Sequence, residues 1–111
     1  MDSKRQNKIS RLLQKELSGL FENEYRNAFG NLLITVTKTT ITTDLAVAKF
    51  YLSFFPPEKM KDAMAKIEAS NKEIRRHLGE KMKNQLRIIP EIRFYVDDSL
   101  DYIDNIEKLL K

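Results

Sequence analysis

Cysteine and tryptophan are absent from the 111-residue chain, and histidine occurs once, at position 77. Without cysteine the chain has no disulfide, thiolate metal site or cysteine nucleophile, which fits a reducing compartment such as the cytoplasm. His77 lies in the segment "IRRHLG", with no nucleophile pattern and no metal-ligand spacing around it. We therefore expect no catalysis, no metal site, no cofactor and a neutral, solvent-facing His77.

Long apolar runs are also absent, and no stretch approaches the length of a membrane span. The first ten residues, "MDSKRQNKIS", are polar and lack the apolar region of a signal peptide. Apolar residues still make up 41% of the chain, which is enough for one buried core in a domain of this size. We expect a cytoplasmic protein without membrane contact, and a monomer, because no apolar heptad pattern is present.

Positive charge is concentrated in two segments of the chain. The total of +4 combines +4 in residues 1–15 and +5 in residues 59–93 with −2 in residues 16–58 and −3 in residues 94–111. Basic segments of this kind favour polyanionic partners such as nucleic acid.

The first predicted element is a helix over residues 3–22. Ser3 followed by Gln6 resembles a capping box, in which each side chain bonds an early backbone N–H group. The apolar residues recur at helical spacing and are Ile9, Leu12, Leu13, Leu17, Leu20 and Phe21. Residues 23–31 follow as a loop.

A β-hairpin is predicted next, with strands over residues 32–41 and 47–55 around a turn at residues 42–46. The first strand is rich in β-branched residues, and the link is short enough to require antiparallel pairing. In the second strand the alternation places four apolar residues on one face, toward the helices: Ala48, Phe50, Leu52 and Phe54.

The second half of the chain predicts helices over residues 57–69 and 70–85, with a break near Ser70 and Asn71, where polar side chains compete for backbone hydrogen bonds. Pro57 is placed to open the first of them. Residues 91–97 alternate as a third strand, and Asp98 or Ser99 caps a last short helix. The element order αββααβ, with a last helix, indicates an α+β domain.

Three segments in this order resemble the ribosome-binding factor A family of bacterial ribosome-assembly proteins. They are "VTKTTITTDLAVAKFYLSFF" (residues 36–55), "IRRHLGEKM" (74–82) and "LRIIPEIRFYVDDS" (86–99). The resemblance implies a KH-like domain of type II over residues 1–99, with a three-stranded sheet covered by helices on one face. Residues 100–111 would form an acidic C-terminal helix or tail.

The same resemblance implies a non-catalytic factor that binds the small ribosomal subunit and its rRNA during late subunit maturation and rRNA processing. Other assembly factors would be further partners. The chain departs from the family at the junction of the two helices, where the family has Ala-x-Gly. Here the segment is Ala69-Ser70-Asn71, or Ser70-Asn71-Lys72 if Ile74-Arg75 sets the register, and the chain contains no Gly-x-x-Gly segment. The clamp by which ordinary KH domains hold single-stranded nucleotides is therefore missing, and we expect recognition of structured RNA by shape and phosphate contacts.

The candidate RNA-binding residues are the cations of the first helix and those around the helix that ends near residue 85. Each would pair with phosphate oxygens, although a solvated helix face explains the same residue types. Arg75 and Arg87 rank first because they lie in the matched segments. The full set is Lys4, Arg5, Lys8, Arg11, Lys15, Lys72, Arg75, Arg76, Lys81, Lys83 and Arg87.

Two alternatives remain open. Lys49, Tyr51, Arg93 and Tyr95 fall on the outward face of the sheet, where they would either stack RNA bases or pack across the strands. The chain could also be a protein-interaction module with a KH-like fold and no direct RNA role, using a methionine groove or the acidic tail. Its methionines at 60, 64 and 82 fall on the apolar stripes and fit core packing equally well.

Overall fold

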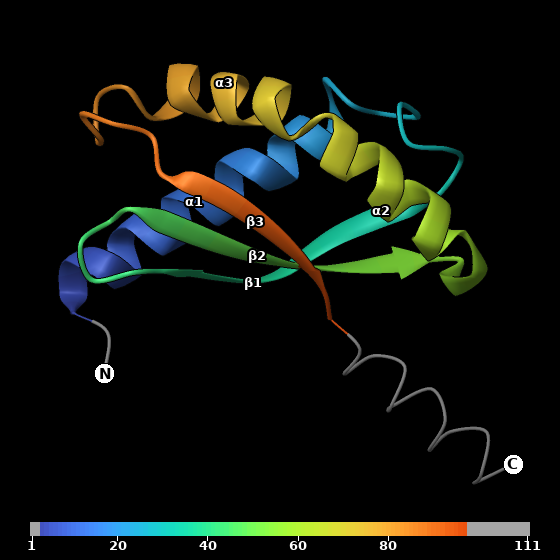
Figure 1. The fold of residues 1–111 in the computed structure, drawn as a ribbon, viewed down its shortest axis with the longest axis horizontal. Coiled ribbons are helices and arrows are strands. Elements are labelled where there is room, and N and C mark those ends of the chain that lie inside the picture. The colour runs from blue at the N-terminus through green and yellow to red at the C-terminus, as the bar shows by residue number, and fades with distance from the viewer. Residues whose placement is uncertain (1–2, 98–111) are drawn as a thin grey trace, which may run out of the picture.

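The computed structural model describes residues 3–97 and has the predicted α+β element order αββααβ (Figure 1). The expected last helix lies outside the described residues. Among the helices that are described, none is both long and apolar enough to cross a membrane. The elements are α1 (Lys4–Glu22), β1 (Leu33–Ile41), β2 (Val47–Phe55), the 3₁₀ turn η1 (Pro57–Lys59), α2 (Met60–Ala69), α3 (Asn71–Met82) and β3 (Glu91–Val96).

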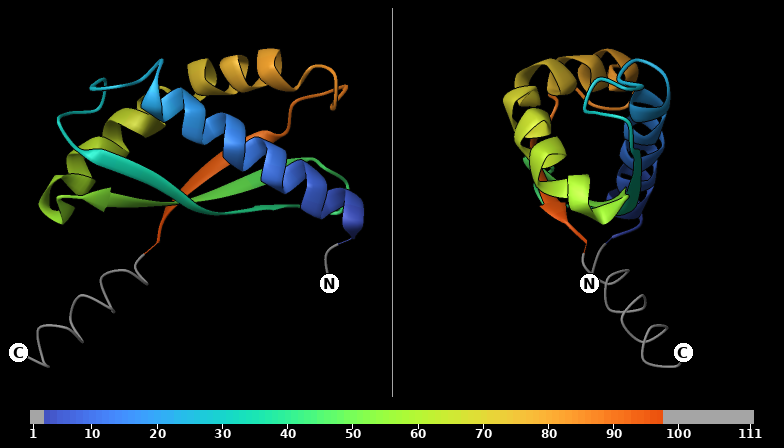
Figure 2. Two further views of the ribbon diagram at one scale, coloured as in Figure 1. Left: turned by 180° about the vertical axis from the view of Figure 1, so that it is seen from behind. Right: turned by 90° about the vertical axis from the view of Figure 1, so that its right-hand side faces the viewer.

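The strands form one sheet in the order β1-β2-β3, and α1, α2 and α3 all lie on the same face of it (Figures 1 and 2). β1 and β2 pair antiparallel as expected from the short turn, whereas β3 pairs with β2 in parallel. A parallel pair needs a long crossover connection, and α2 with α3 supplies it. The expected sheet covered on one face by helices is confirmed.

The core lies between this face and the helices. Ala48, Phe50 and Leu52 of β2 are completely buried, as are Leu13 and Leu17 of α1. This confirms the predicted inward face of the second strand. Burying an aliphatic or aromatic side chain of this size contributes about 1.5–3 kcal/mol, so the central strand supplies much of the stabilisation.

The junction between α2 and α3 confirms the predicted break. α2 ends at Ala69, Ser70 has φ −96° and ψ 9°, and α3 begins at Asn71. α3 is shorter than predicted and ends at Met82 instead of residue 85. The N–H groups of Gln85 and Leu86 both bond to the Met82 carbonyl at 2.9 Å, which turns the chain and buries Leu86.

Helix α1 covers the outer edge of the sheet at β1. The predicted capping box is present, since Ser3 Oγ accepts from the Gln6 N–H group and Gln6 Oε1 accepts from the Ser3 N–H group. The buried Gln6 also donates from Nε2 to the Ile41 carbonyl at 3.0 Å, and Gln14 donates to the Val36 carbonyl at 3.3 Å. These two amides occupy carbonyls of an edge strand, where unpaired groups would otherwise attract another strand.

The loop after α1 packs its aromatic side chains into the core. Tyr25 stacks on Phe29 with ring centroids 5.4 Å apart and meets the edge of His77 at 5.8 Å. The expectation of a solvent-facing His77 is wrong, because its side chain is 21% exposed and lies 3.9 Å from a Glu73 carboxylate oxygen. Burial, and then the charge of Glu73, raises the pKa of the Tyr25 hydroxyl.

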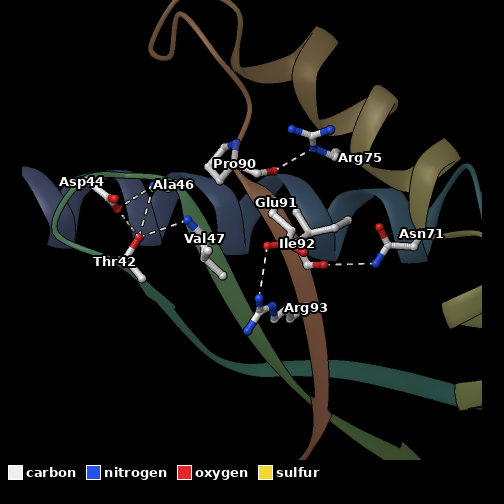
Figure 3. Close-up of polar contacts among 10 residues, drawn as sticks. All are labelled: Thr42, Asp44, Ala46, Val47, Asn71, Arg75, Pro90, Glu91, Ile92 and Arg93. Atoms are coloured by element: carbon white, nitrogen blue, oxygen red, sulfur yellow. Dashed lines mark hydrogen bonds and ion pairs between the residues drawn. The ribbon is translucent and has the colours of Figure 1, made fainter.

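The turn between β1 and β2 is held by two polar side chains (Figure 3). Thr42 Oγ1 donates to Asp44 at 2.7 Å and accepts from the Val47 N–H group at 3.0 Å, while Asp44 accepts from Ala46 at 3.1 Å. The hydroxyl of Thr42, followed by the Ala46 N–H group, lowers the pKa of the Asp44 carboxyl. These bonds fix a turn in which Leu45 adopts a positive φ of 60°.

Replacing the amide of Gln6 by a carboxylate tests the link between α1 and β1. Gln6→Glu keeps the acceptor for Ser3 but places an acceptor against the Ile41 carbonyl, so we expect a loss of about 1–3 kcal/mol in the free energy of unfolding. Asn7→Asp is the matched control, because Asn7 is exposed on the same turn. Urea unfolding measures both, and equal losses in the two variants would contradict the proposed bond.

The lowered pKa of Asp44 predicts a pH-dependent contribution to stability. A carboxyl with a folded-state pKa below its unfolded value stabilises the fold above the unfolded pKa, about 3.9, and loses that effect as pH falls through the folded pKa. Asp44→Asn should therefore destabilise the protein at about pH 7 and make little difference at about pH 2. Urea unfolding of the parent and the variant across this range would refute the effect if the difference between them stayed constant.

Candidate nucleic-acid interface

Four cations form a straight stripe on the exposed side of α1. Lys8, Arg11 and Lys15 follow Lys4 at intervals of four, seven and eleven residues, which places all four on one helix face, opposite the buried leucines. The stripe extends for about 16 Å at the rise of an α-helix. Arg5 is also exposed, but it points about 100° around the helix axis from Lys4 and so lies on a neighbouring face. A shallow hollow on the stripe is lined by Lys4, Asn7, Lys8, Arg11 and Leu12.

A second group of cations surrounds α3. The exposed members are Lys72, Arg76, Lys81, Lys83 and Arg87. Arg76 pairs with Glu80 at 3.2 Å on the same helix face, so part of its charge is compensated. Lys81 lies in the last turn of the helix, and Lys83 and Arg87 lie on the loop of residues 83–90 that leads to β3.

Part of each group lies at the same end of the molecule, on either side of the 42–46 turn. The first half of α1 and the 83–90 loop lie at the same end of the long axis, and both views in Figures 1 and 2 (left) agree on this. We call this surface the basic end and define it as Lys4, Lys8, Arg11, Lys81, Lys83 and Arg87. The other cations lie farther from this end: Lys15 in the second half of α1, and Lys72, Arg75 and Arg76 in the first half of α3.

Arg75 has a structural role that its sequence position did not reveal. Its guanidinium donates from Nε to the Pro90 carbonyl at 2.9 Å (Figure 3). It also donates from Nη2 to the Ile89 carbonyl at 2.8 Å. Asn71, one turn earlier on α3, donates to the Ile92 carbonyl at 3.1 Å. Together these two side chains fix the backbone that enters β3. A phosphate contact by Arg75, expected from its charge, stays a prediction.

The outward face of the sheet carries a ladder of side chains across the three strands. Tyr51 and Tyr95 are register partners and stack with centroids 5.4 Å apart, and Lys38 Nζ lies 5.9 Å from the centre of the Tyr51 ring. Cross-strand packing, one of the two alternatives considered for this face, is therefore present. Arg93 is held by Glu91 at 3.2 Å, and stacking of RNA bases here stays a prediction.

Thr37, one of the residues matched to the family, holds the sheet together. The pairing of β1 with β2 shifts between Val36 and Lys38, which leaves Thr37 in a bulge. Its hydroxyl bonds to the Asp97 carboxylate beyond the end of β3 and lies 3.2 Å from the Tyr51 carbonyl. One side chain thus links β1 to β2 and to the residue that follows β3. This structural role accounts for the presence of Thr37 and Asp97 in the matched segments.

Sequence reasoning missed the exposed apolar residues. Leu33 and Phe55 are register partners, 63% and 69% exposed, at the opposite end of the hairpin from the 42–46 turn. Ile88 on the 83–90 loop is 79% exposed. Their apolar character gave no signal because neighbouring apolar residues of the same segments are buried or partly buried. Met82, in contrast, belongs to the core.

Comparisons with known proteins agree with the resemblance found in the sequence. A family model described as ribosome-binding factor A matches residues 5–110. The chain is 43% identical over 110 residues to the ribosome-binding factor A of Cytophaga hutchinsonii, covering 99% of this chain and 83% of that protein. Against the Flavobacterium psychrophilum protein of the same name the identity is 42% over 111 residues, covering 99% and 85%.

Solved structures show the same fold. The crystal structure of ribosome-binding factor A from Thermus thermophilus gives a TM-score of 0.67 at 18% identity, covering 82% of this chain and 94% of that one. The solution structure of a putative Thermotoga maritima relative gives 0.66 at 22% identity, covering 86% and 89%. On the family match and the two curated relatives, the chain belongs to the ribosome-binding factor A family.

Proposed function

We propose that this protein binds the small ribosomal subunit by placing its basic end against the phosphates of the rRNA. The observation that carries the proposal is that the cation-bearing first half of α1 and the 83–90 loop lie at the same end of the fold. Membership of the ribosome-binding factor A family supports it. So does a structural neighbour, a homology model of the Thermus thermophilus protein fitted into the cryo-EM map of a 30S complex, with a TM-score of 0.62.

The chemistry of the basic end suits a folded RNA. Lysine and arginine on two separate elements reach phosphates that follow one another along a helical backbone, and each contact releases bound counterions. The junction at Ser70 has no glycine to admit a nucleotide backbone closely. We infer that the protein assists late maturation and rRNA processing as a non-catalytic cytoplasmic factor, alongside other assembly factors.

A protein-interaction module is the second candidate. The observation in its favour is the exposed pair Leu33 and Phe55 at the opposite end of the fold. Such a contact would depend on apolar area and would respond weakly to salt, whereas phosphate contacts weaken steeply as salt rises.

Charge reversal at the basic end separates the two candidates. Lys8→Glu/Arg87→Glu should weaken binding to purified small subunits at least about 100-fold at moderate salt and lower the slope of log Kd against log salt by about 2. The matched control is Arg26→Glu/Lys61→Glu, which reverses two exposed cations on the loop after α1 and on α2. Filter binding or ultracentrifugation across a salt series gives both quantities.

Equal effects of the two double variants would show that net charge matters and that the basic end does not. Binding that ignores salt in the parent would favour the protein-interaction module. Circular dichroism of each variant confirms that the fold is intact before either result is interpreted.

Arg75→Lys distinguishes a phosphate contact from the structural role of Arg75. Lysine keeps the charge but has one nitrogen in place of the two that serve Ile89 and Pro90. We expect Arg75→Lys to lower the free energy of unfolding by about 1–2 kcal/mol and to weaken subunit binding, since the loop carrying Arg87 is released. Arg76→Lys is the control on the exposed face. A stable Arg75→Lys variant with normal binding would assign Arg75 to charge alone.

A further inference from the structure

Ile88 is an exposed apolar side chain on the 83–90 loop, which carries two cations of the basic end. It is 79% exposed, the largest value among the exposed large apolar residues that the structure describes. Its neighbour in the chain is Arg87, and Lys83 lies on the same loop. A single exposed isoleucine is ordinary by itself, whereas one held outward by a fixed loop is not.

The backbone on both sides of Ile88 is anchored. On one side Leu86 is buried and its N–H group bonds to the Met82 carbonyl at 2.9 Å. On the other side Pro90 is fully buried, and the Arg75 guanidinium binds the carbonyls of Ile89 and Pro90. These anchors hold Ile88 outward on a short, fixed loop.

Ile89 completes the loop's attachment to α3. It packs partly buried against the core, close to Gly79, where an added Cβ would lie 3.7 Å from the Ile89 Cβ atom. One isoleucine of the pair therefore faces the protein and the next faces solvent. A β-branched side chain has few rotamers, so a contact made by Ile88 costs little ordering of either its backbone or its side chain.

We propose that Ile88 is the apolar anchor of the RNA contact, lying against riboses in the minor groove of a double-helical rRNA segment while Arg87 and Lys83 bind flanking phosphates. The inference rests on the proposed function. It adds that the RNA minor groove is the surface bound and that Ile88 is the residue that enters this groove. The minor groove of A-form RNA is wide and shallow, which suits a short side chain on a rigid loop. Apolar side chains enter nucleic-acid minor grooves in other proteins.

The charges around Ile88 favour RNA over a protein partner. Lys81, Lys83 and Arg87 are exposed on the same short stretch, and the paired acid Glu80 already binds Arg76. A protein contact centred on one isoleucine would have to desolvate these cations, whereas phosphates on either side of a groove neutralise them.

The substitution Ile88→Ser tests whether the apolar side chain contributes to the affinity for the small subunit. We expect binding to small subunits to weaken about five- to tenfold, because part of the apolar contact is lost, with the salt slope unchanged. Ile88→Leu should bind like the parent. Arg87→Gln should lower the salt slope by about 1, since it removes a phosphate contact. Leu33→Ser is the matched control for an exposed apolar residue elsewhere.

The absence of cysteine allows a second measurement that identifies what Ile88 touches. Ile88→Cys provides a single attachment point for a photoreactive probe on the otherwise cysteine-free chain, and Leu33→Cys is its control. Crosslinks from position 88 to rRNA on the small subunit are expected. Crosslinks mainly to a ribosomal protein, or none, would overturn the inference.

An Ile88→Ser variant that binds as well as the parent would also overturn the inference while leaving the proposed function standing. If the parent itself shows no salt-dependent binding to small subunits, the proposed function fails and the inference fails with it. Urea unfolding of Ile88→Ser separates a binding defect from a folding defect.

Discussion

Two side chains of α3 bind the backbone that enters β3, and the position of the candidate binding surface on the 83–90 loop depends on these bonds. Arg75 occupies the carbonyls of Ile89 and Pro90, and Asn71 occupies that of Ile92. A parallel third strand gains no register from a tight turn, so its start has to be fixed by the elements that it passes. The same bonds set the position of the 83–90 loop, and with it Arg87 and Ile88. Arg75, which bonds to the backbone of the fold, thus positions Arg87 on the surface.

The sheet has an edge strand on either side, and both edges carry bonds from helices. The amides of Gln6 and Gln14 bind carbonyls of β1, while Asn71 binds one of β3. Thr37 ties β1 to the chain just past β3 through Asp97. Covered edges discourage pairing with other strands, which matters for a small mixed sheet whose outward face has no helix over it among residues 3–97 (Figure 2).

The sequence predicted what is encoded locally. The capping box at Ser3, the inward alternation of β2 and the break before Asn71 each follow from neighbouring residues, and the family resemblance identified the fold. The roles that depend on distant contacts were missed. Nothing local indicates that Tyr25 packs against His77 or that Gln6 reaches Ile41. The cations of the candidate site were predicted as residues, but their placement at the same end of the molecule required the three-dimensional arrangement of α1 and α3.

The covering of β1 by α1 also has a consequence for the order of events during synthesis. α1 leaves the translating ribosome before the strands that it packs on, since the carbonyls bound by Gln14 and Gln6 belong to residues 22 and 35 positions later. Until β1 and β2 have emerged, the apolar stripe of α1 has no sheet to pack on, and an isolated helix of this length is marginal in water. The nascent chain therefore carries its basic helix exposed and unanchored, so the domain folds only when the hairpin closes over it.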